Sequence, residues 1–139
     1  MKLLIDTNIF LEIILEQEHA EEAKRLFAGG KSHDFFLTDF SMHSIGLLLF
    51  RRSQPQIFQQ FLLDTILSGV VILIAHPIES MEAVAESAKK WNLDFDDAYQ
   101  YATAGTFDLT IVSFDADFDR TDRGRKTPGD IMRQSGKGP

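Results

Sequence analysis

Aspartates gather at three places that are far apart in this sequence. Asp6 ends the short apolar run 1–5, and a second group, within 94–97, stands at the start of a helical pattern. The third group, within 115–119, follows an apolar run that is typical of a buried strand. Carboxylates brought together raise one another's pKa values unless a cation offsets their charge. The pattern therefore favours a site for Mg²⁺ or Mn²⁺, which both prefer oxygen ligands.

Each acidic group also has a reading that needs no metal. Any residue of the segment Asp6-Thr7-Asn8 can cap the helix that follows it. Asp94 makes a good helix cap as well, and acids in the first turn of a helix are stabilised by the partial positive charge at its N-terminus. The segment 113–119, taken alone, is a polar loop with aromatic anchors. In the functional reading, Asp6 binds the metal while Asn8 orients Asp6 or a bound water.

The elements that must position these acids alternate between strands and helices. Apolar runs predict strands over 2–6, 35–38, 70–74 and 109–114, and helical periodicity predicts helices over 8–17, 19–28, 39–52, 55–69, 81–91 and 94–105. The stretch 45–50 alone would also fit a strand. Such alternation predicts an α/β fold in three layers, with a central, mostly parallel sheet flanked by helices. Asp6 and Asp115 stand at the carboxyl ends of strands, where sites form in such sheets.

Composition places the chain among folded, water-soluble proteins. It has 139 residues, 44% of them hydrophobic, and 12 phenylalanines, which fits one domain over 1–134 with a flexible tail at 135–139. The absence of cysteine excludes disulfides and thiolate metal sites. The apolar runs are too short to span a bilayer, and the N-terminus does not resemble a signal peptide. We expect a cytoplasmic protein without membrane contact.

The net charge of −7 is unevenly distributed. Residues 120–139 carry six basic and two acidic residues, whereas the rest of the chain carries eight basic and 19 acidic residues. An acidic body binds nucleic acid poorly, because phosphate contacts need Lys and Arg. The basic segment can offer a phosphate-facing patch beside an acidic site, or it can be a solvated tail. The candidates for phosphate contacts are Arg120, Arg123, Arg125 and Lys126.

Three segments in this order resemble a PIN domain, the metal-dependent ribonuclease fold that includes VapC-type toxins. They are Leu4–Asn8, Asp97–Ala104 and Ile111–Phe118, and the resemblance spans essentially the whole chain. It implies an acidic pocket for one or two Mg²⁺ or Mn²⁺ ions. The metal-site acids that it implies are Asp6, Asp97 and Asp115, with Asp117 and Asp119 as further candidates. Ser113 stands where the family often has Thr or Ser beside the site.

The chain departs from this family at one position. The family usually places a Glu on the helix after the second strand, and Ser44 occupies the corresponding position here. Asp39 or His43 are candidates to substitute for it, although His43 also fits a core or site-rim histidine. Asp94 or Asp96 are further candidates to compensate.

Two functions follow from these readings. The first is a metal-dependent endoribonuclease, as a toxin whose partners are RNA, an antitoxin protein and a second copy of the chain. The alternative is a catalytically degenerate PIN-like module that binds RNA or a protein. An aspartate-phosphorylated protein fits less well, because Asn8 stands where haloacid-dehalogenase-like phosphatases need Asp. Receiver domains need an acid after a middle strand, where this chain has 75–77, Ala-His-Pro.

Overall fold

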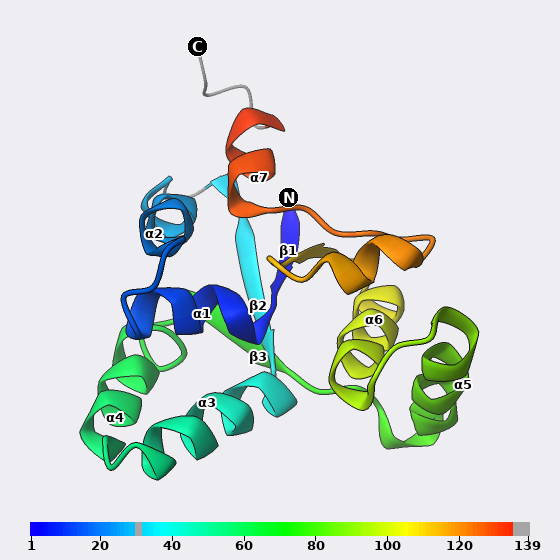
Figure 1. Cartoon of the computed structure of the whole chain (residues 1–139), viewed down its shortest axis with the longest axis horizontal. Coiled ribbons are helices and arrows are strands. Elements are labelled where there is room, and N and C mark those ends of the chain that lie inside the picture. Colours follow the sequence, from blue (N-terminus) through cyan, green and yellow to red (C-terminus); the bar gives the residue numbers. More distant parts are fainter. Residues whose placement is uncertain (30–31, 135–139) are drawn as a thin grey trace.

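The sheet at the centre of the molecule is entirely parallel. The computed structural model describes residues 1–29 and 32–134. Its strands are β1 (Lys2–Ile5), β2 (Asp34–Thr38), β3 (Val71–Ile74) and β4 (Thr110–Val112), in the spatial order β3-β2-β1-β4. In the register, Leu4 of β1 lies opposite Phe36 of β2 and Ile111 of β4. The first and last strands of the described chain are therefore neighbours (Figure 1).

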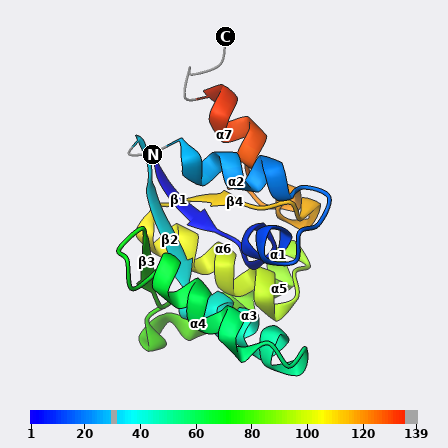
Figure 2. The same ribbon diagram turned by 90° about the vertical axis from the view of Figure 1, so that its left-hand side faces the viewer.

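Helices cover both faces of this sheet. One face carries α1 (Thr7–Ile14), α2 (Ala20–Ala28), α3 (Asp39–Arg51), α4 (Pro55–Asp64) and α7 (Pro128–Gln134). The other face carries α6 (Phe95–Phe107), and α5 (Met81–Trp91) packs on the outside of α6 (Figures 1 and 2). Successive β1 side chains point to opposite faces, so Leu3 and Ile5 enter one core while Leu4 packs against Ala104 and Phe118. The expected three-layer α/β architecture is confirmed.

Several predicted boundaries differ from the observed ones. The first helix ends at Ile14, because Glu16 adopts a left-handed backbone with φ of 51°. The fourth helix ends at Asp64 rather than near Gly69. The stretch 45–50 is helical, so its reading as a strand is wrong. Three elements were not predicted: the 3-10 helices η2 (Ile78–Ser80) and η3 (Ala116–Arg120), and α7. The predicted tail, 135–139, lies outside the described residues.

The carboxyl ends of β1 and β4 bring distant parts of the chain together. Asp6 follows β1 directly, and its backbone N–H donates to Val112 O over 3.0 Å. Ser113 follows β4 in the same way. Helix α6 begins beside this edge, so its first turn faces the two strand ends. No helix in the described part of the chain is both long and apolar enough to span a membrane.

Candidate metal site

Three carboxylates meet at the carboxyl edge of the sheet. Asp97, Asp115 and Asp117 each place one oxygen within 4.8 Å of the others. Asp97 is buried, and the other two are half-buried. They come from the first turn of α6 and from the loop that follows β4, so the predicted meeting of distant acids occurs. Asp117, which the sequence left as a further candidate, belongs to this group.

Helix capping positions these acids and is not an alternative to the site. Asp94 caps α6 by accepting the Asp97 N–H over 3.1 Å, which fixes the first turn that presents Asp97. Asp115 caps η3 in the same manner, accepting the Asp117 N–H over 2.8 Å. The two capping bonds therefore fix the backbone turns that carry Asp97 and Asp117.

Asp6 lies beside the three acids but is already fully hydrogen-bonded. One carboxylate oxygen accepts the Thr7 N–H at 2.9 Å and the Gln100 amide at 3.0 Å. The other oxygen accepts the Ser113 hydroxyl at 2.7 Å and the Asn8 amide at 3.3 Å. A carboxylate offers about four acceptor positions, so Asp6 can bind a metal directly only by releasing one donor. The Asn8 bond is the longest of the four.

Asn8 and Ser113 connect Asp6 to the loop that carries Asp115. The Asn8 amide donates to the Ser113 hydroxyl at 3.1 Å, and its oxygen accepts the Phe114 N–H at 3.2 Å. The Ser113 hydroxyl accepts the Asp115 N–H at 2.9 Å. These two side chains lie where the sequence reading placed them, next to the acids.

Gln100 was not predicted as a site residue. It lies one turn after Asp97 on α6, is almost completely buried, and its amide donates to both Asp6 and the Ser41 hydroxyl, the latter at 2.8 Å. Ser41 also accepts a 2.8 Å bond from the Thr7 hydroxyl. Gln100 Oε1 has no hydrogen-bond partner in the structure. The sequence feature that could have indicated Gln100 is its spacing: it is a polar residue three positions after Asp97, which places both on one side of the helix.

The clustered charge changes the acidity of these groups. Burial, followed by repulsion from Asp115, Asp94 and Asp6, raises the pKa of Asp97 to about 8. Burial also raises the pKa of Asp6, against the lowering effect of its hydrogen bonds from Ser113 and Gln100. The protein therefore holds these acids together at an electrostatic cost.

The residues considered as replacements for the family's usual Glu are bonded to other groups or exposed. Ser44 is half-buried on α3, and no described group forms a hydrogen bond with its side chain. Asp39 accepts the Tyr99 hydroxyl at 2.8 Å and the Phe40 N–H at 2.8 Å. His43 is exposed, so its reading as a core histidine is wrong. Asp96 is also exposed.

The basic residues near the site are engaged with other groups. Arg120 Nη1 lies 3.4 Å from Asp117, and Arg125 pairs with Asp119 at 3.2 Å. Asp119 therefore faces Arg125 and does not join the acidic group. Arg123 pairs with Asp108 and bonds the Leu109 carbonyl, at the opposite end of β4 from Ser113. Lys126 pairs its backbone with β4 and leaves its side chain exposed.

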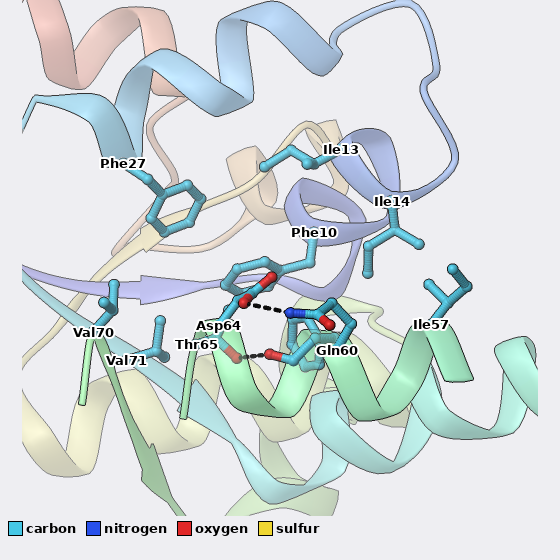
Figure 3. A pocket seen from close by; sticks show the side chains of 11 residues that line it. Phe10, Ile13, Ile14, Phe27, Ile57, Gln60, Asp64, Thr65, Val70 and Val71 are labelled. Carbon is cyan, nitrogen blue, oxygen red and sulfur yellow. Dashed lines mark hydrogen bonds between the residues drawn. The ribbon is translucent and has the colours of Figure 1, made fainter. Parts of the chain in front are cut away.

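A separate apolar pocket of about 320 Å³ lies away from the acids. Figure 3 shows side chains of α1 and α2 above it and of α4 below it. Its lining includes Phe10, Ile13, Phe27, Ile57 and Val71. The polar residues at its rim are bonded within α4, as in the 2.8 Å bond from Gln60 to Asp64. The pocket offers apolar surface, and none of the clustered acids lines it.

Comparison with known proteins agrees with this geometry. The sequence pattern of the PIN domain matches residues 3–124. The chain belongs to the PIN-domain family. No curated protein sequence matches it significantly. The match covers the first strand, the acidic turn of α6 and the loop after β4, which are the PIN-domain elements that carry the acids.

Solved structures share this PIN fold at low sequence identity. VapBC2 from Rickettsia felis, bound to a promoter DNA fragment, superposes with a TM-score of 0.72 at 16% identity, covering 91% of this chain and 97% of that one. A toxin–antitoxin complex from Klebsiella pneumoniae gives 0.69 at 20% identity, with the same coverages. VapC20 from Mycobacterium tuberculosis, a toxin that cleaves the sarcin–ricin loop, superposes with a TM-score of 0.66 at 21% identity, covering 84% of this chain and 92% of that one.

The donor set of the acidic group fits a hard divalent cation. Oxygens on opposite sides of an octahedral Mg²⁺ lie about 4.2 Å apart, since each bond is about 2.1 Å. Oxygens on adjacent sides lie about 3 Å apart. The three carboxylate oxygens all lie within 4.8 Å of one another, which gathers them on the scale of one such coordination sphere. A cation would also remove the repulsion that raises the pKa of Asp97. Both distance and charge therefore suit Mg²⁺ or Mn²⁺.

Proposed function

We propose that this PIN domain is a metal-dependent endoribonuclease that hydrolyses RNA phosphodiester bonds, and that it acts as the toxin of a toxin–antitoxin pair. The observation that carries the proposal is the meeting of Asp97, Asp115 and Asp117 within 4.8 Å, with the pKa of Asp97 raised to about 8. The solved toxins with the same fold support the assignment to toxins.

In this proposal, each residue has a distinct role. Asp97, Asp115 and Asp117 would hold Mg²⁺ or Mn²⁺, which supplies an activated water and neutralises charge on the phosphodiester. Asp6 adds negative charge beside them and is oriented by Gln100 and Ser113. The backbone capping bonds of Asp94 and Asp115 keep the ligand-bearing turns in place. Arg120 and Arg125 can reach RNA phosphates only by exchanging their acidic partners.

Cleavage of a mixed single-stranded RNA panel with Mn²⁺ or Mg²⁺ tests this function. We expect Asp97→Asn to keep the fold and abolish cleavage, whereas Asp96→Asn, an exposed neighbour on the same turn, should cleave like the unaltered protein. EDTA should abolish cleavage, and Asp6→Asn should reduce it strongly. Full activity in Asp97→Asn would exclude this site.

The alternative, a degenerate PIN module that only binds, is favoured by one observation. Ser44 supplies no carboxylate at the position where the family usually has a Glu. This alternative predicts weak Mn²⁺ binding that Asp97→Asn leaves unchanged. Isothermal titration with Mn²⁺ distinguishes the two functions, because the nuclease requires binding that is lost in that variant.

An antitoxin partner belongs to the same proposal. The apolar pocket between α1, α2 and α4 (Figure 3) is the described cavity best suited to apolar side chains of such a protein. Co-expression with the product of the neighbouring gene, followed by co-purification, tests the pairing. Val70→Asp, at a half-exposed position of the pocket lining, should abolish the complex if the pocket is the contact. Gln59→Asp, at an exposed position of α4 outside the lining, should not.

A further inference from the structure

Phe95 presents an aromatic face to solvent at the entrance of α6. Its relative exposure is 52%, although it is the first residue of the helix that carries Asp97. Two rings hold it from behind: Phe40, edge-on at 5.7 Å between centroids, and Tyr99 at 6.0 Å. The Tyr99 hydroxyl is itself fixed between the Asp39 carboxylate and the His76 N–H. The exposed ring is therefore held in place.

Phe95 and Tyr99 lie on the same two turns of α6 as Asp97. Phe95 stands between Asp94, which caps α6, and Asp96, one residue before Asp97. Phe40 is the second residue of α3 and lies one turn before Ser44, on the same helix face. The aromatic cluster of Phe40, Phe95 and Tyr99 thus occupies the side of the site from which the usual carboxylate is missing.

Charge around the site limits how RNA can be bound. The chain carries a net charge of −7, and Arg120, Arg123 and Arg125 each pair with an acid. Contacts that do not depend on phosphate charge must then supply part of the affinity. Stacking of an unpaired base on an aromatic ring is such a contact.

We propose that Phe95 stacks on an unpaired nucleobase of single-stranded RNA next to the phosphodiester held at the acidic group. This proposal rests on the proposed nuclease function and names the part of its substrate that the site recognises. A protein partner fits this ring less well, because one exposed ring offers far less apolar area than a stable protein interface buries. A single ring supported from behind suits one flat base.

Binding of a short single-stranded RNA containing 2-aminopurine tests the proposal without cleavage, if every protein also carries Asp97→Asn. Phe95→Leu, which keeps an apolar side chain but no aromatic face, should weaken binding about 5- to 150-fold. Phe95→Trp should bind at least as tightly as the parent. Phe107→Leu is the matched control, because Phe107 is 41% exposed at the far end of the same helix. It should not change binding.

An abasic site moved along the RNA locates the stacked base. At one position the effect of Phe95→Leu should disappear, because there is no base left to stack. Unchanged affinity in Phe95→Leu, an equal loss in Phe107→Leu, or no RNA binding by the parent would each overturn the proposal. If Phe95→Leu leaves metal-dependent cleavage intact, the stacking proposal is overturned and the nuclease function stands. If RNA binding depends on Phe95 but the unaltered protein does not cleave RNA, the nuclease function is overturned and stacking stands.

Discussion

The Gln100 amide donates a 3.0 Å hydrogen bond to Asp6, 94 residues earlier in the chain, and so connects two distant segments at the acidic site. The same amide nitrogen donates to Ser41 on α3, so one side chain connects α6 to β1 and to α3. Because Gln100 follows Asp97 by one helical turn, the bond fixes α6 at the height where Asp97 meets Asp115. Orientation of the acids therefore depends on a neutral residue.

Gln100→Ala should lower RNA cleavage by about 10- to 100-fold, since it removes a group that orients a carboxylate of the site. It should also destabilise the fold by about 1–3 kcal/mol, because Asp6 and Ser41 lose a buried partner. Cleavage assays and urea unfolding measure the two effects. Gln59→Ala, an exposed glutamine on α4, should change neither. Unaltered activity in Gln100→Ala would contradict an orienting role.

The metal-free protein should lose stability as the pH rises from about 4 to about 8. The pKa of Asp97 is about 8 in the folded protein and about 3.9 in an unfolded chain, so the folded state binds more protons in this interval. The raised pKa of Asp6 acts in the same direction. Thermal unfolding in EDTA across this range measures the effect. Asp97→Asn should flatten the curve, and a flat curve for the unaltered protein would contradict the coupling.

Asp117 and Asp119 should differ in their effect on metal binding. Asp117 belongs to the group within 4.8 Å, whereas Asp119 pairs with Arg125. Asp117→Asn should weaken Mn²⁺ binding by tenfold or more, and Asp119→Asn should leave it within about twofold, because only Asp117 is placed as a ligand. Calorimetric titration measures both. Equal effects of the two changes would show that general charge, and not ligation, governs affinity.

Ser44→Glu should strengthen metal binding. It supplies a carboxylate at the position that the family resemblance assigns to the usual Glu, on a half-buried face of α3. Higher affinity for Mn²⁺, and a larger rise in Tm on adding the ion, are the expected results. His43→Glu, on the exposed neighbouring position, is the control and should raise neither. A Ser44→Glu protein with unaltered affinity would show that α3 stands too far from the ion.

The sequence was sufficient to predict the layers of the fold and two of the three clustered acids. The patterns at a helix start and a strand end marked the acidic groups 94–97 and 115–119, and the PIN-domain resemblance named Asp97 and Asp115 within them. Gln100 was missed because a neutral side chain carries no charge pattern of its own. Asp117 and Asp119 are two residues apart, and only the turn of η3 decides which faces the acids. Helix α7 was missed because a basic, glycine-containing stretch does not show its packing of Ile131 into the core.

The pairing of β1 with β4 also sets when the site can exist. Asp6 is synthesised more than a hundred residues before Asp115 and Asp117, which follow β4 in the chain. Until β4 docks beside β1, Asp6 lacks its bond from the Ser113 hydroxyl, and the group of Asp97, Asp115 and Asp117 cannot form. If the proposed nuclease function holds, a growing chain is inactive against RNA until β4 has been made and has docked beside β1.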